Sequence, residues 1–173
     1  MTDRFAHHLR LDQIRDGERL DLMADDAERQ AIAKRLRLDS LDRLEAHATL
    51  SRNGEVVRVD GRLVAALDQS CVVTGEPVAA HVDEPFEILF MPEPPTGPDE
   101  EIELGEADCD VVFHDGAAID LGTAIADTLA LSVDPYPRSA SADAALREAG
   151  VLSEEQASPF AVLAALKGRE REE

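Results

Sequence analysis

Cysteine and histidine are the residues best suited to chemistry in this chain, and their spacing fits no metal or nucleophile motif. Cys71 is followed by two valines and then Thr74, whereas a zinc knuckle needs a second thiol about two residues on. The other cysteine, Cys109, has only His114 close by in the sequence, which is too few ligands for a metal. We therefore expect Cys71 to be a small buried residue, and we predict no metal and no cofactor.

The remaining candidates for catalysis are equally sparse. The chain has no phosphate-binding glycine loop, no G-x-S-x-G motif and no H-E-x-x-H motif. We expect His47 on the polar face of a strand, and His81 and His114 on the surface, where neighbouring carboxylates favour the charged imidazole. The sequence thus predicts no catalytic residue and no small-molecule substrate.

Charge is distributed very unevenly along the 173 residues, whose formal net charge is −20. Residues 1–62 hold 12 Lys and Arg against 13 Asp and Glu, whereas residues 63–173 hold 5 against 24. No Lys or Arg lies between Arg62 and Arg138. That stretch would repel a phosphate backbone. Its acidity either serves solubility alone or attracts a basic protein.

A modest basic cluster offers an alternative function, direct RNA binding by a helix. Asp39 and Asp42 interrupt this cluster, so the sequence leaves RNA contact open. Its members are Arg29, Lys34, Arg35, Arg37 and Arg43.

No membrane association is predicted, because no run approaches the ~18 apolar residues of a membrane helix. The N-terminus lacks the apolar core of a signal peptide. Two cysteines make no disulfide framework. We expect a cytoplasmic protein.

The first half of the chain shows signals for one helix and two strands. Asp25 and Glu28 have the spacing of a capping box and predict a helix over about 25–37. Alternating apolar residues over 44–50 predict a strand, and Asn53-Gly54 predicts a hairpin turn. We expect a bend or bulge at Gly61, and then a buried strand from Leu63 to Val73.

The second half begins with a long strand over 78–90, in which apolar residues recur with period two. Pro85 indicates an edge strand or a bulge. Two short strands are predicted near 102–104 and 111–113. A second helix begins after Asp120 and ends before the prolines at 135 and 137, and a short exposed helix is predicted within 142–149.

These elements predict an α+β fold: an antiparallel, curved sheet with two packed helices and a C-terminal helical segment. The sequence leaves open whether the sheet closes into a barrel. We assign residues 1–137 to a single α+β domain and 138–157 to a flexible polar linker. A short helical motif follows at 158–167 and a charged tail at 168–173.

The helical motif combines a capping Ser158 with Pro159 in the first turn. Isolated helices this short are marginal in water, so the motif needs a surface, either on its own domain or on a partner. Its candidate partner-binding residues are Pro159, Phe160, Val162, Leu163, Leu166 and Lys167.

Three segments of this chain, 71–78, 119–138 and 159–167, together resemble the YceD family of large ribosomal RNA subunit accumulation proteins. The likeness spans roughly residues 40–167, and its Pro-Tyr-Pro form is similar to the alphaproteobacterial branch. Many members carry Cys-x-x-Cys where this chain has Cys71 and Thr74. The residues that carry the resemblance are Cys71, Glu76, Pro77, Asp120, Leu121, Pro135, Tyr136 and Pro137.

The resemblance implies a bacterial cytoplasmic factor needed for accumulation of 23S ribosomal RNA, with no known enzymatic activity. We accordingly expect a non-catalytic factor of large-subunit biogenesis. It would act through its acidic surface and its C-terminal motif on a basic ribosomal or ribosome-assembly protein. Direct RNA binding by the Arg29–Arg43 helix is the alternative.

Overall fold

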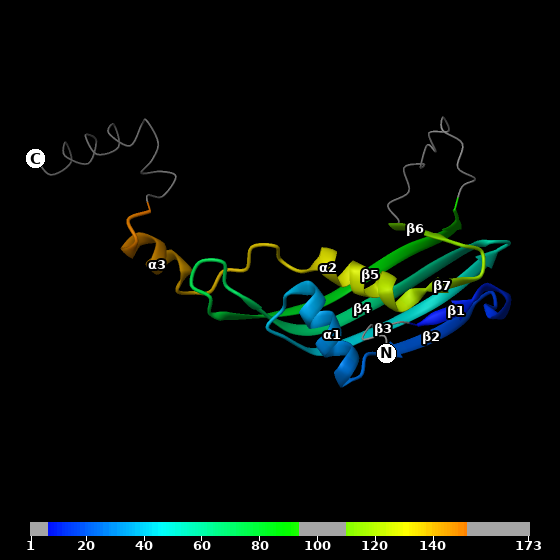
Figure 1. Ribbon diagram of the computed structural model, residues 1–173, viewed down its shortest axis with the longest axis horizontal. Helices are drawn as coiled ribbons and strands as arrows, with labels where there is room; N and C mark the ends of the chain where they lie inside the picture. Colours follow the sequence, from blue (N-terminus) through cyan, green and yellow to red (C-terminus); the bar gives the residue numbers. More distant parts are fainter. Residues whose placement is uncertain (1–6, 94–109, 152–173) are drawn as a thin grey trace, which may run out of the picture. The chain divides into compact units, whose positions relative to one another are not determined.

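The computed structural model describes residues 7–93 and 110–151. The elements in order are β1 His8–Arg10, the 3₁₀ turn η1 Leu11–Gln13, β2 Glu18–Met23, α1 Asp26–Leu36, β3 Ser40–Asn53, β4 Val56–Ser70, β5 Pro77–Pro92, β6 Asp110–His114, β7 Ala118–Asp120, α2 Leu121–Ser132 and α3 Ala142–Glu148. The structure has an open sheet and two larger helices (Figure 1), and it includes four short elements that the sequence did not predict, β1, η1, β2 and β7.

The main sheet has five strands in the order β2-β3-β4-β5-β6. Its pairing is antiparallel between β2 and β3 and between β3 and β4, and parallel between β5 and β6. The sheet is open, with β2 and β6 as its edges, so it does not close into a barrel. A second, two-stranded sheet joins β1 to β7. The predicted α+β class is confirmed.

The hairpin of β3 and β4 turns at Asn53-Gly54, where Gly54 has a positive φ of 65°. Of the predicted bend or bulge at Gly61, a bulge is absent from this pairing, because the register runs through Ala48 and Gly61 without a shift. The shift lies between Leu41 and Arg43 instead. A bend at Gly61 stays a prediction. Glycine is needed at position 61 for space: an added Cβ would lie 2.5 Å from the His47 carbonyl oxygen and 2.5 Å from Cζ of Phe86.

Strand β5 confirms the long period-two prediction, since its buried and exposed residues alternate up to Asp83 and again after Pro85. Pairing with β6 begins only at Ile88. Pro85 therefore lies in the part of β5 whose outer edge has no partner among residues 7–93 and 110–151, which is where a sheet tolerates proline. The predicted strand near 111–113 is β6, and the one near 102–104 lies outside the described residues.

Both larger helices begin with the predicted caps. The Asp25 side chain accepts from the Glu28 N–H at 2.9 Å, and the Glu28 side chain accepts from the Asp25 N–H, which completes a capping box. Asp120 accepts from the Thr123 N–H at 2.9 Å at the start of α2. Helix α1 ends at Leu36 and is followed by its C-cap Arg37, the one non-glycine residue with a positive φ in the described part of the chain.

The core lies between the main sheet and the two helices that cover one face of it (Figure 1). An ion pair between Arg35 of α1 and Asp127 of α2, 3.0 Å long, links the helices at their surface. Aliphatic side chains fill most of the core, in keeping with an aromatic share of 3%. The largest fully buried side chains are Phe90, Leu44, Leu50, Leu63, Ile88, Ile119, Leu121, Ile125, Leu129, Val57 and Val59.

His114 departs from its predicted surface position, because only 6% of it is exposed. Its Nδ1 accepts from the Gly116 N–H at 3.0 Å, and its Nε2 lies 2.8 Å from the Glu55 carbonyl oxygen. This pattern uses the imidazole with its proton on Nε2, which donates to Glu55. The two bonds satisfy a polar side chain that burial would otherwise penalise.

The chain divides into two compact units. Unit 1 comprises residues 1–69 and 79–135, and unit 2 comprises residues 70–78 and 136–173. Within unit 2 the predicted short helix is present as α3, with Ala142 buried at its start. The linker over 138–157 stays a prediction, and the motif at 158–167 lies outside the described residues.

Candidate functional site

The residues of the cysteine-bearing segment form a tight turn, which we call the Cys71 turn and define as Ser70–Val78. Strand β4 ends at Ser70 rather than at the predicted Val73, because the chain reverses at once. The Cys71 N–H donates to the Glu76 carbonyl at 2.7 Å, and the Gly75 N–H donates to the Cys71 carbonyl at 2.9 Å. Gly75 has a positive φ of 74°, which suits a residue without a side chain.

The thiol of Cys71 is buried, with 3% of the residue exposed. Its Sγ accepts from the backbone N–H of Thr74 at 3.4 Å and from that of Ser139 at 3.2 Å. Burial by itself raises the pKa of Cys71, but the hydrogen bonds from Ser139 and Thr74 outweigh it and lower the pKa to about 6. A pKa of about 6 favours the thiolate form of Cys71 at neutral pH, and burial leaves the sulfur little access to solvent.

Polar side chains beside the thiol gather around the carboxylate of Glu76. Oε2 of Glu76 accepts from Thr74 Oγ1 at 3.1 Å and from Ser141 Oγ, and Ser139 Oγ lies 3.1 Å from Thr74 Oγ1. Hydrogen bonds from Ser141, Ser139 and Thr74 hold the pKa of Glu76 below its usual range. These contacts fasten the Cys71 turn to the start of α3.

The Cys71 turn presents one thiol and no second cysteine within the turn. Backbone N–H groups point at Cys71 Sγ, but position 74 carries a threonine whose hydroxyl bonds to Glu76 and Ser139. Nowhere in residues 7–93 and 110–151 do three or more His, Cys, Asp or Glu side chains gather so as to hold a metal. The hydrogen bonds of Cys71, Thr74 and Glu76 fix the conformation of the Cys71 turn.

The cations of the alternative site, on α1, its C-cap and the start of β3, are mostly paired with carboxylates. Arg29 pairs with Asp26, Arg35 with Asp127, and Arg43 with Glu45. Beside α1 and the start of β3 lies a groove of about 520 Å³. Its lining carries both signs of charge; the residues are Asp26, Arg29, Gln30, Ala33, Lys34, Leu38, Asp39, Ser40, Leu41 and Asp42.

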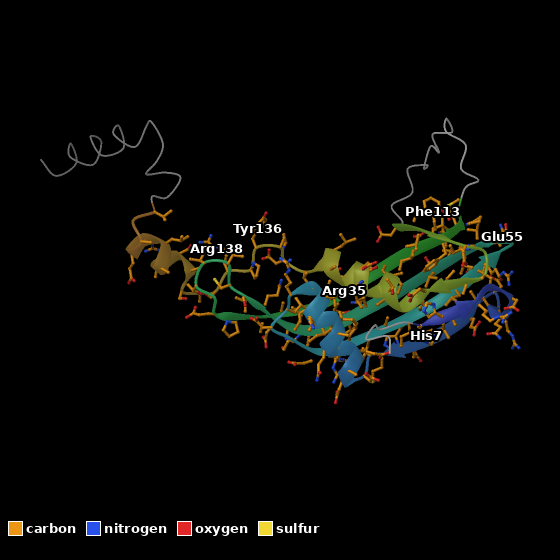
Figure 2. The ribbon with its side chains drawn as sticks, in the orientation of Figure 1. His7, Arg35, Glu55, Phe113, Tyr136 and Arg138 are labelled. Carbon is orange, nitrogen blue, oxygen red and sulfur yellow. The ribbon has the colours of Figure 1, made fainter. Side chains whose placement is uncertain are left out.

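The structure brings two of the family segments together. The Val72 N–H donates to the Pro137 carbonyl at 2.9 Å, so residues 71–78 lie against residues 137–141. Glu76 and Pro77 belong to the turn itself, and Pro137 is buried. Tyr136 projects outward from its segment (Figure 2) and is 73% exposed.

The other described residues that carry the family resemblance, Asp120, Leu121 and Pro135, lie in unit 1. Asp120 caps α2 and Leu121 is fully buried at its first turn. Pro135 follows the helix, as expected for a residue that ends it. The partner-binding residues at 159–167 lie outside the described part.

Sequence reasoning missed Ser139 and Ser141 as partners of the turn. They lie 65 to 68 residues from Thr74, Glu76 and Cys71, and no local pattern announces such a pairing.

An open five-stranded sheet with helices on one face, together with a turn fixed by hydrogen bonds, defines a small acidic α+β protein. Residues 59–167 match the sequence profile of the YceD family, described as large ribosomal RNA subunit accumulation protein YceD. The match covers more than half of the 173 residues, and the chain belongs to this family. No curated protein and no solved structure matches the chain. The described helices include none with the length and apolar character needed to span a membrane.

Proposed function

We propose that this chain is a non-catalytic cytoplasmic factor that supports accumulation of 23S ribosomal RNA. It does so by binding a basic ribosomal or ribosome-assembly protein. The family description supports the biological role. The binding mode rests on the charge distribution and on the apolar C-terminal motif.

Segregation of charge is the observation that carries the proposal. Strands β5 and β6 and helix α2 all lie within the stretch between Arg62 and Arg138 that has no Lys or Arg. The arginines of β4 neutralise only part of it: Arg58 pairs with Glu87 at 2.9 Å, and Arg62 with Asp83 at 2.5 Å.

Further acidic side chains of this region, including Glu84, Glu93 and Asp110, make no ion pair within residues 7–93 and 110–151. A surface with this surplus raises the encounter rate with a cationic partner and discourages nucleic acid.

Direct RNA binding receives less support from the same contacts. Of the five cations in the basic cluster, Arg29, Arg35 and Arg43 are paired with carboxylates. Only Lys34 and Arg37 have no ion pair within the described ranges. Because affinity for a phosphate backbone scales with the number of phosphates that cations neutralise, two cations beside several aspartates give a weak site.

The test compares two double variants in cells that depend on this protein. Phe160→Ala/Leu163→Ala removes the proposed anchors, and Met23→Ala/Leu131→Ala removes exposed apolar side chains of similar size elsewhere. We expect the first variant, and not the second, to lose the co-purified basic protein and to lower the ratio of 23S to 16S ribosomal RNA. Recovery of the same proteins and the same ratio with both variants would refute the proposal.

A further inference from the structure

The edge strand β2 has the regular backbone of a strand that can pair with a further chain. Its residues, Glu18–Met23, include no proline, and their register with β3 runs without a shift. Edge strands that stay unpaired are commonly interrupted by proline or by a bulge. No strand within residues 7–93 and 110–151 pairs with the outer side of β2. That side of β2 therefore offers an uninterrupted row of backbone donors and acceptors.

The hydrogen bond at the end of β2 shows which residues point outward. The Ala24 N–H donates to the Leu44 carbonyl of β3 at 3.0 Å. Residues that bond to the partner strand alternate with residues that do not in an antiparallel ladder, so Leu20 also bonds toward β3. The N–H and C=O groups of Arg19 and Asp21 consequently point to the outer side.

The side chains at the centre of β2 are complementary to a second copy of themselves. Arg19 and Asp21 carry opposite charges and are both exposed on the face of the sheet that points away from the core, where Asp21 Oδ1 lies 2.6 Å from Nδ1 of His47. Leu20 lies between them on the core face and is only partly buried. When a second β2 runs antiparallel with Leu20 opposite Leu20, Arg19 of each copy lies opposite Asp21 of the other.

Charge selects this register over the two nearest alternatives. Outward-pointing residues must lie opposite one another for the two backbones to bond, so the alternatives are displaced by two residues. One places Arg19 opposite Arg19, and the other places Asp21 opposite Asp21. Like charges directly opposite one another destabilise a pair of strands, whereas opposite charges stabilise it. Of the three registers, only the one centred on Leu20 brings opposite charges together.

The formal net charge of −20 opposes self-association, but most of it lies away from β2. Residues 1–62, which include β2, hold 12 Lys and Arg against 13 Asp and Glu. Strands β5 and β6 of the acidic stretch are three and four strands away in the sheet, about 14 and 19 Å at the usual spacing. Figure 1 shows β2 and β6 at opposite edges. Pairing through β2 thus keeps the acidic edges of two copies far apart.

We propose that two copies of this chain associate through antiparallel pairing of β2 with β2, centred on Leu20. Each copy contributes the same residues, as in other twofold interfaces. The backbone groups of Arg19 and Asp21 bond across the axis, their side chains form two ion pairs, and the two Leu20 side chains cover one another. One short strand from each copy buries less than the ~1,200 Å² of a standard interface, so the dimer is weak and its share depends on concentration.

Sedimentation velocity of the purified full-length protein at rising concentration tests this pairing. We expect the wild type to sediment as monomer and dimer, with a dimer share that rises with concentration. Arg19→Asp and Asp21→Arg each place like charges opposite one another, and each should weaken the dimer by about tenfold or more. The matched control is Asp60→Arg, which makes the same change of charge on the same face of β4. It should dimerise as the wild type does.

A mixture of the two interface variants supplies the second measurement. Arg19→Asp leaves two acidic side chains at the centre of β2, and Asp21→Arg leaves two basic ones, so a heterodimer regains both ion pairs. We expect the equimolar mixture to dimerise at concentrations at which each variant alone is monomeric, which also shows that both variants are folded.

Three results would overturn the proposal: a wild type that stays monomeric throughout, interface variants that dimerise as the wild type does, or a mixture that forms no heterodimer. Species larger than a dimer would also overturn it, because a twofold pairing of β2 closes after two copies. Since no partner protein is present, failure here leaves the co-purification result of the proposed function standing.

Discussion

Burial and two backbone N–H donors determine the ionisation state of the Cys71 thiol. An isolated thiol in an apolar site stays protonated, because burial disfavours the charge. Here the donors of Thr74 and Ser139 outweigh that effect and bring the pKa to about 6. The two donors therefore favour the thiolate although the side chain is buried.

Stability of the protein should depend on pH through this thiol. The pKa of Cys71 is about 6 when folded and 9.0 for a thiol in its ordinary state. Between these values the unfolded chain binds more protons than the folded one, so the thiol's contribution grows as pH rises from about 6 to 9. The contribution is lost as pH falls through about 6. We expect the Tm difference between wild type and Cys71→Ala to widen across this interval.

Thermal unfolding followed by circular dichroism at closely spaced pH values measures this difference. Both proteins share every other titrating group, so subtracting one curve from the other isolates the thiol. A difference that stays constant up to pH 9.0 would mean that Cys71 titrates as an ordinary thiol.

Gly61 is the second position where one residue decides a contact. Gly61→Ala should lower the free energy of unfolding by about 1–3 kcal/mol, the usual range for overpacking. The backbone oxygen of His47 cannot move away from the added methyl. The aromatic ring of Phe86, in contrast, can be replaced by the smaller side chain of leucine. Urea denaturation of Gly61→Ala, Phe86→Leu and the double variant should show coupling that partly restores stability. Strictly additive effects would argue that the ring does not press on this glycine.

At the scale of elements, the two larger helices, α1 and α2, each begin where a side chain satisfies a free backbone N–H. Asp120 bonds both the N–H and the hydroxyl of Thr123, at 2.9 and 2.7 Å, directly after the short strand β7. Asp120→Ala should therefore cost about 1 kcal/mol. Asp120→Asn, which keeps an acceptor, should cost only a few tenths of that value. Chemical denaturation distinguishes the two, and equal losses would indicate that the charge rather than the cap is what matters.

Local signals were sufficient for most elements, because caps, turns and periodicity depend on residues close in sequence. The capping box at Asp25, the turn at Asn53-Gly54 and the alternation of β5 all fall in this class. Contacts between distant residues were not predictable. His114 is buried and donates to the carbonyl of Glu55, 59 residues away.

In the candidate site, too, features set by local sequence were predictable and contacts between distant residues were not. The sequence pointed to Cys71 as a buried residue, and it is buried. Its ionisation depends on Ser139, 68 residues further on, and no spacing rule connects the two positions. Glycine at 61 was anticipated as a special position, but the groups that require it, the carbonyl oxygen of His47 and the ring of Phe86, belong to other strands.

For the whole molecule, the proposed function predicts that charge and apolar anchors make separable contributions to partner binding. Long-range attraction accelerates encounter, because it acts before contact and is screened by salt. Short-range apolar contact slows dissociation, because it must be undone for the partner to leave. The acidic stretch between Arg62 and Arg138 and the segment 159–167 should therefore affect different rate constants.

Surface plasmon resonance with the basic partner captured from cells measures both rate constants. Glu84→Gln/Glu93→Gln/Asp110→Asn removes acidic side chains that make no ion pair within residues 7–93 and 110–151. This variant should associate more slowly, with a weaker dependence on salt, and dissociate as the wild type does. Phe160→Ala/Leu163→Ala should associate at nearly the wild-type rate and dissociate at least about tenfold faster, since ~1.4 kcal/mol is the least that two lost anchors should cost. If the charge variant altered only dissociation, the acidic side chains would lie inside the contact itself, and the steering argument would fail.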